Sequence, residues 1–127
     1  MLVNIPASLG ELLDKISILI IKKNNIKDKK KQIYILDELN HLNQILKSII
    51  PESKIEFYLN KLIDINSELW KIEDSIRDCE RKNKFDQKFI DLARAVYITN
   101  DKRSKIKLEI NNKFGSKIVE VKSYQKY

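Results

Sequence analysis

The arginines are the residues of this sequence whose distribution most suggests chemistry. There are four, against 21 lysines, and they all lie in one stretch of the chain: Arg77, Arg81, Arg94 and Arg103. A genome that favours lysine codons would not confine arginine to one segment. The guanidinium group differs from the lysine ammonium in its rigid fork, which binds a carboxylate or a phosphate with two parallel hydrogen bonds. The cluster therefore indicates a role that lysine would not fill.

Two interpretations of this cluster stay open. In the first, the arginines form a structural network with carboxylates of neighbouring helices. The candidate partners are Asp74, Asp78, Asp91 and Asp101. In the second, they line an anion-binding cleft for a phosphate, a carboxylate or a sugar-linked nucleotide. The predicted anion-binding residues are then Arg77, Arg81, Arg94 and Arg103, with Asn100 and Lys102 from the adjoining polar run.

Other residue types offer less chemistry. His41 follows Glu38 with the Glu-x-x-His spacing of di-iron helical bundles, but such a site needs a second pair, and the sequence has one histidine. Cys79 falls on the apolar face of an expected helix and is interpreted as a core residue. We therefore expect no metal and no cofactor, and no catalytic residue is identified.

The elements that position these residues are expected to be helices. The chain has 127 residues, 43% of them hydrophobic, and only two glycines and two prolines. One domain over 1–127 fits that length, and so few turn formers disfavour β-sandwiches and barrels. The fold class predicted is all-α, an elongated antiparallel bundle of four to five helices.

The first helix is expected to begin at Ser8, because Ser8 and Glu11 have the spacing of a capping box. Ile18 and Ile21 widen its apolar stripe, which indicates a central helix or one in a subunit interface. After the lysine-rich stretch 22–31, a second helix is expected over about 31–49, and Pro51 ends it.

The third helix, expected over about 52–82, carries two apolar series that recur every seven residues. They are Ile55, Leu62, Leu69 and Ile76, and Tyr58, Ile65, Ile72 and Cys79. Such series are typical of a seam between packed helices. A helix this long would extend beyond a spherical monomer, so either the fold is an elongated hairpin or a second subunit covers the exposed stripe. Of the two, we favour a homodimer.

Asp86 is expected to cap a fourth helix that ends at Gly115. The polar run 99–105 interrupts its apolar period, so either one helix passes through this run or a fifth helix begins there. The tail, with Ile118, Val119, Val121 and Tyr124, is a candidate to pair with residues 3–5 as a tiny β-ribbon.

The net charge of +7 admits a polynucleotide partner, and the lysines of 22–31 would be its contact. Codon bias accounts for the same lysines without a partner, so this alternative ranks last. No apolar run approaches the length of a membrane span, and no signal sequence is recognised. The expectation is a cytoplasmic protein that does not contact a membrane.

The stretch 3–19, VNIPASLGELLDKISIL, resembles the opening of an uncharacterised bacterial family, and so do the runs 85–103, 110–111 and 115–124. That family is a domain of unknown function from marine bacteria and their phages, often encoded near sugar-transfer genes. The resemblance implies a connection with surface polysaccharide. The pattern Leu-x-x-Leu-Leu-Asp-Lys-Ile is also loosely similar to the helical chorismate mutases, which hold a substrate carboxylate with an arginine in that helix. Here the first arginine is Arg77.

Three functions follow from the sequence. The first is a non-catalytic helical binding or assembly module, dimeric, with an arginine-rich anion-binding patch. The alternative is a small-metabolite enzyme of the helical-bundle type, acting on an anionic substrate. Nucleic-acid binding is the third, and the sequence does not decide whether catalysis occurs.

Overall fold

Four helices form the protein. The computed structural model describes residues 1–118, 120–123 and 126. The helices are α1 (Leu9–Asn25), α2 (Lys29–Ile49), α3 (Glu52–Arg81) and α4 (Gln87–Phe114), and no strand occurs within the described ranges. The all-α prediction is confirmed. None of these helices is both long enough and apolar enough to cross a membrane.

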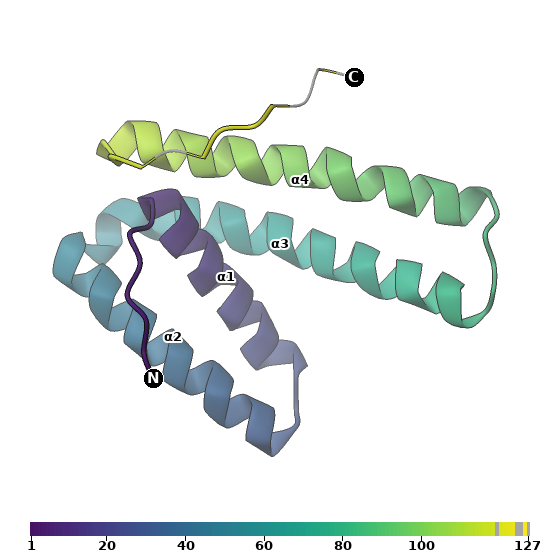
Figure 1. Ribbon diagram of the computed structural model, residues 1–127, viewed down its shortest axis with the longest axis horizontal. Helices are drawn as coiled ribbons and strands as arrows, with labels where there is room; N and C mark the ends of the chain where they lie inside the picture. The colour runs from purple at the N-terminus through teal and green to yellow at the C-terminus, as the bar shows by residue number, and fades with distance from the viewer. Residues whose placement is uncertain (119, 124–125, 127) are drawn as a thin grey trace.

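The two longest helices, α3 and α4, make an antiparallel hairpin, and α1 lies against one half of it (Figure 1). The fourth member, α2, packs on α1. Helix α1 contacts each of the other three, so the central position suggested by its wide apolar stripe is confirmed. The other halves of α3 and α4 extend beyond α1 and give the molecule its elongated shape.

Most helix ends agree with the capping residues. Ser8 Oγ accepts a hydrogen bond from the backbone N–H of Glu11 at 3.0 Å, and Asp86 Oδ1 accepts one from Phe89 at 3.4 Å. Gly115 ends α4 in the left-handed conformation, with φ 66°. Helix α2 starts two residues earlier than predicted because Asp28 caps it. The lysine-rich stretch is therefore largely helical, and only residues 26–28 connect α1 to α2.

Two of the open alternatives are decided. A fifth helix is absent from the described residues, since α4 is continuous through 99–105. The β-ribbon is also absent: residues 3–5, Ile118 and Val121 are not in strands, while Val119 and Tyr124 lie outside the described residues. Helix α4 continues because its backbone hydrogen bonds are satisfied internally, while Arg103 of the polar run reaches Asp14 of α1.

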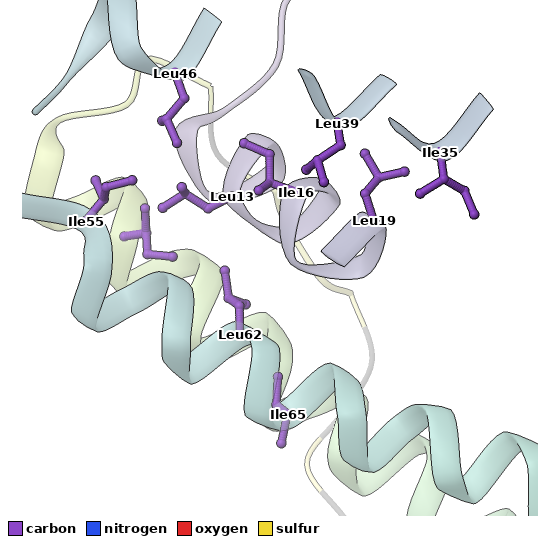
Figure 2. Packing of buried hydrophobic residues seen from close by; sticks show 10 residues of the cluster. Leu13, Ile16, Leu19, Ile35, Leu39, Leu46, Ile55, Leu62 and Ile65 are labelled. Atoms are coloured by element: carbon purple, nitrogen blue, oxygen red, sulfur yellow. The ribbon is translucent and has the colours of Figure 1, made fainter. Parts of the chain in front are cut away.

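The core lies where α1 meets α2 and α3 (Figure 2). Its buried members are Leu13, Ile16, Leu19, Ile35, Leu39, Leu46, Ile55, Leu62, Ile65 and Ile110. The two seven-residue series on α3 are thus confirmed in most positions, since Ile55, Leu62, Ile65, Leu69 and Cys79 are buried. Farther along, Ile72 and Ile76 are only half-buried because α1 no longer covers that part of α3.

Gly10 lets the first turn of α1 approach the backbone of α4. Its N–H donates to Asn111 Oδ1 at 2.8 Å. A Cβ at this position would stand 2.6 Å from the carbonyl oxygen of Lys107 and 2.9 Å from Asn111 Oδ1. The carbonyl belongs to the helix backbone and has little freedom to move, so the absence of a side chain sets this crossing.

We predict that Gly10→Ala destabilises the protein by about 1–3 kcal/mol, the usual cost of forcing atoms into a packed contact. Urea unfolding followed by circular dichroism measures it. Gly115→Ala is the comparison: its Cβ would meet nothing within 4 Å and suffers only from the positive φ, which costs about 1 kcal/mol. A Gly10→Ala protein as stable as the parent would show that the close approach is not needed.

Candidate functional site

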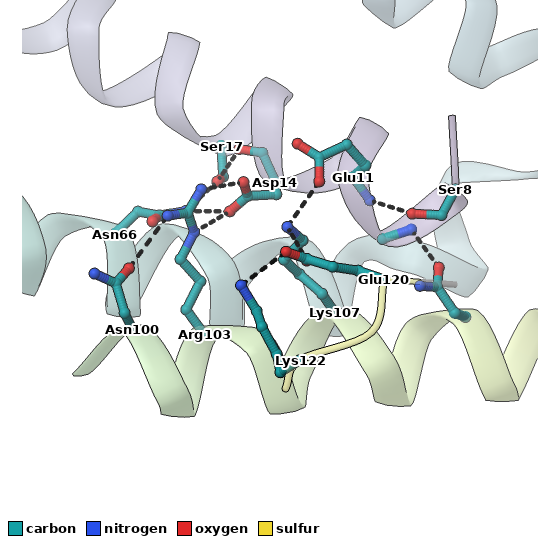
Figure 3. Close-up of polar contacts among 12 residues, drawn as sticks. Ser8, Glu11, Asp14, Ser17, Asn66, Asn100, Arg103, Lys107, Glu120 and Lys122 are labelled. Carbon is teal, nitrogen blue, oxygen red and sulfur yellow. Dashed lines mark hydrogen bonds and ion pairs between the residues drawn. The ribbon is translucent and has the colours of Figure 1, made fainter. Parts of the chain in front are cut away.

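The centre of the candidate site is an ion pair between α1 and α4. Asp14 is 1% exposed, and Arg103 reaches it with two nitrogens (Figure 3). Nε of Arg103 donates to Oδ1 of Asp14 at 2.8 Å, and Nη2 donates to Oδ2. The hydrogen bonds to Asp14 raise the pKa of Arg103 further above its ordinary value, against the opposing effect of burial. We call this pair the Asp14–Arg103 fork.

Helix α3 joins the fork through Asn66. Its Nδ2 donates to Asp14 Oδ1 at 2.9 Å and to Ser17 Oγ at 2.8 Å. The Ser17 hydroxyl in turn donates to the backbone oxygen of Asp14 at 2.6 Å. No buried side-chain nitrogen or oxygen of the described residues lacks a partner. A buried carboxylate is tolerated only with such compensation, so the network fixes α1, α3 and α4 relative to one another.

Helical spacing explains why these side chains meet. Asn100, Arg103, Lys107 and Asn111 follow one another at intervals of three, four and four residues and therefore share one face of α4. On α1, Gly10, Asp14 and Ser17 share the face that turns toward them. The polar run that interrupts the apolar period of α4 is thus the part of a helix that faces a buried carboxylate.

One turn beyond the fork, Lys107 forms a second set of ion pairs. Its side chain is 9% exposed, and its Nζ lies 2.7 Å from Glu11 Oε2 and 2.9 Å from Glu120 Oε2. Burial acts to lower the pKa of Lys107, but the hydrogen bonds to both carboxylates outweigh it and raise the pKa. Lys122, with Lys107, lowers the pKa of Glu120 to about 2. In a capping box, the carboxylate of Glu11 would accept a hydrogen bond from the backbone N–H of Ser8. Here it pairs with Lys107 instead.

Two cavities adjoin this network, and Asn100 and Arg103 line both. The first, of about 380 Å³, is the Trp70 cleft between α1, α3 and α4. Its lining is Ile18, Ile21, Asn66, Leu69, Trp70, Glu73, Asp74, Arg77, Asn100 and Arg103. The second, of about 470 Å³, is the Lys107 cavity. Its lining is Glu11, Val96, Tyr97, Asn100, Asp101, Arg103, Ser104, Lys107, Glu120 and Lys122.

Of the predicted anion-binding residues, the structure brings Arg77, Asn100 and Arg103 together at the Trp70 cleft. Arg77 bonds Glu73 of its own helix at 3.1 Å. The other three are not among the residues that line either cavity. Arg81 lies 3.7 Å from Asp78, and Arg94 and Lys102 are exposed on α4. Arg103 thus pairs with a carboxylate of a neighbouring helix, as the first interpretation expects, whereas Arg77 and Arg81 pair with carboxylates of their own helix.

Several residues of the site were not anticipated. Asp14, Ser17, Asn66 and Lys107 carry the buried network, and Asp14 replaces the aspartates expected to pair with Arg103. The available signal was a carboxylate within the apolar stripe of α1, since Asp14 follows Leu12 and Leu13 directly. Among the residues expected to be inert, Cys79 is buried and His41 is exposed. The described part of the chain contains no group of side chains suited to a metal ion.

Comparison with protein-family models, with curated proteins and with solved structures finds no match for this chain. The resemblances drawn from the sequence stay predictions. The chemistry of the site has to be inferred from its own residues.

We predict that Asp14→Asn lowers the free energy of unfolding by about 2–4 kcal/mol, because it leaves the partly buried charge of Arg103 without its carboxylate. Urea denaturation measures the change. Glu73→Gln is the matched control, since it makes the same chemical change in the exposed pair with Arg77. That pair contributes less than about 1 kcal/mol. Equal losses in the two variants would contradict a special role for Asp14.

Proposed function

We propose that this chain is a non-catalytic binding module whose ligand is a small organic anion held in the Trp70 cleft. The observation that carries the proposal is the composition of that cleft. Three apolar side chains and an indole line it together with two arginines, two asparagines and two carboxylates. Ligand sites usually combine an apolar surface with a few converging polar groups, in volumes of about 300–1,000 Å³.

The apolar part of the cleft supports a ligand with a ring. Ile18, Ile21 and Leu69 line the cleft together with Trp70, which is half-buried. An indole offers a large flat face that stacks against rings at little entropic cost. Ile18 and Ile21, which widen the apolar stripe of α1, thus also line one side of a candidate binding site.

The polar part supports a phosphate or a carboxylate. The described contacts of Arg103 engage Asp14 and Asn100 and leave guanidinium N–H groups without a partner. Arg77 pairs with Glu73 at the surface, where 66% of the arginine side chain is exposed. Such exposed pairs are weak, so a ligand oxyanion can take the place of Glu73.

The carboxylates of the cleft refine the ligand class. Glu73 and Asp74 accept hydrogen bonds from hydroxyl groups and repel a ligand that is uniformly negative. A molecule with an oxyanion at one end and hydroxyls on a ring at the other satisfies both sides, as a nucleotide or a phosphorylated sugar does. Neither histidine nor cysteine is among the described lining residues, and the proposal includes no acid–base step.

The homodimer expected from the sequence stays a prediction. It is supported by the halves of α3 and α4 that extend beyond α1 (Figure 1), and by Ile90 near the start of α4, which is 46% exposed. A cytoplasmic location and a link to surface polysaccharide also stay predictions. The same holds for the two alternative functions, an enzyme and a nucleic-acid-binding protein.

Trp70 is the only tryptophan of the chain and reports on the cleft directly. We expect uridine diphosphate, which joins a ring, hydroxyls and a diphosphate, to quench its fluorescence saturably. Arg77→Gln should weaken that binding about tenfold, the usual worth of a hydrogen-bonded charged contact. Arg94→Gln removes the same charge outside both cavities and should change nothing.

Glucose 1-phosphate and pyrophosphate extend the same titration to a phosphorylated sugar and to an anion without a ring. Weaker binding of pyrophosphate than of the ring-bearing probes supports the stacking role of Trp70. Absence of a saturable response to all three probes, or equal loss in Arg77→Gln and Arg94→Gln, would overturn the proposal.

A further inference from the structure

The Lys107 cavity differs from the Trp70 cleft because a segment of the chain itself places a charged group in it. Glu120 belongs to the tail that follows α4, and its carboxylate lies 2.9 Å from the Nζ of Lys107. Lys122, two residues on, lies 2.8 Å from the same carboxylate group. Arg103 also lines the cavity, so three cationic side chains share it with the carboxylates of Glu11, Asp101 and Glu120.

Packing does little to hold this part of the tail. Ile118 and Val121, the apolar residues on either side of Glu120 that the structure describes, are 44% and 85% exposed. Ser116 fixes the beginning of the tail, because its Oγ accepts a hydrogen bond from the backbone N–H of Leu9 at 3.3 Å. The described contacts of Glu120 with the helices are therefore electrostatic, and 39% of its side chain remains exposed to competing anions.

We propose that the Lys107 cavity is a second ligand site, specific for an oxyanion, and that the Glu120 carboxylate is its internal occupant. A phosphate or carboxylate group of a free ligand displaces Glu120 and releases the tail. This site shares Asn100 and Arg103 with the Trp70 cleft but is otherwise lined by different residues, and its existence does not depend on the function proposed for that cleft.

The charge of Lys107 explains why the cavity needs an occupant. A side-chain ammonium that is 9% exposed requires compensation by nearby acceptors. Glu11 supplies one carboxylate from the first turn of α1, where the cap at Ser8 fixes its backbone. The second carboxylate comes from the tail. An ammonium group donates more hydrogen bonds than these two contacts use, so an oxyanion with several oxygens can make at least as many.

Glu120 has an advantage over a free ligand because the chain holds its carboxylate close to Lys107. A group held by a short flexible linker acts at an effective concentration of about millimolar. A simple anion must therefore reach that range to displace Glu120, whereas a phosphate with further contacts to Arg103 or Ser104 needs less. The low pKa of Glu120 keeps its carboxylate charged at neutral pH, so the competition is between anions.

The test compares Glu120→Gln with Glu109→Gln in the full-length chain. Both variants remove one carboxylate, but Glu109 is an exposed residue of α4 that pairs with Lys61. Inorganic phosphate and malonate are titrated, and the amide resonances of Ser104 and Lys107 are followed by NMR beside the Trp70 indole resonance. Phosphate and malonate distinguish a tetrahedral from a planar oxyanion.

We expect Glu120→Gln to bind phosphate or malonate at least about fivefold more tightly than the parent protein, because the internal competitor is lost. Glu109→Gln should bind as the parent does. The shifts should appear at Ser104 and Lys107 and leave the Trp70 indole unchanged. Unchanged or weaker binding by Glu120→Gln, or shifts confined to Trp70, would overturn the proposal.

Release of the tail gives a second measurement on the unmodified protein. Trypsin cleaves after lysine, and the tail carries Lys117, Lys122 and Lys126. Saturating phosphate should accelerate cleavage there, as the Glu120→Gln change does without ligand. Slower or unchanged cleavage of the tail in the presence of bound phosphate would contradict displacement.

Discussion

A carboxylate that is almost fully withdrawn from water has to be compensated by donors, and Asp14 places this requirement at the middle of the molecule. Arg103 meets it with a two-nitrogen fork, and Asn66 adds a donor from α3. Apolar packing alone allows helices to slide and rotate at modest cost, whereas a fork and an amide fix both the register and the rotation of α1. The remaining features of the site follow from that position.

The fork also shapes what surrounds it. Arg103 is drawn toward α1 and so becomes a wall shared by the Trp70 cleft and the Lys107 cavity. Because α1 is much shorter than α3, the outer half of α3 packs on α4 but not on α1, and Arg77 and Trp70 line a cleft near the end of α1. Toward the other end of α1, Gly10 brings its first turn onto α4 and places Glu11 against Lys107. One short helix thus defines both cavities.

Local signals in the sequence predicted the elements well. The Ser8 cap, the Asp86 cap, the length of α3 and the Gly115 stop depend on neighbouring residues, and each is found. Helix α2 begins at Lys29, earlier than the predicted start near residue 31. The lysine run does not break the helix because lysine is a good helix former, and Asp28 supplies the cap. The continuity of α4 also stayed open, because polar residues within an apolar period look alike in a helix break and in a buried network.

The site was predicted only in part, and the reason is the distance along the chain. Arginine confined to one segment indicated Arg77 and Arg103, but Asp14 lies 89 residues from Arg103 in sequence. Nothing local ties these two positions together. The partner of Lys107 on the tail, Glu120, is equally remote from any motif. Spacing within a helix identifies a face, whereas the packing of three helices decides which faces meet.

Asp14 and Arg103 act as one unit, and the rest of the site depends on their pairing. A double-mutant cycle measures this directly, with Asp14→Asn, Arg103→Gln and the double variant unfolded in urea. Residues coupled through a shared buried network show interaction energies of about 0.5–3 kcal/mol. We expect a coupling energy of about 2 kcal/mol between Asp14 and Arg103, within that range. Additive losses, with a coupling energy near zero, would contradict it.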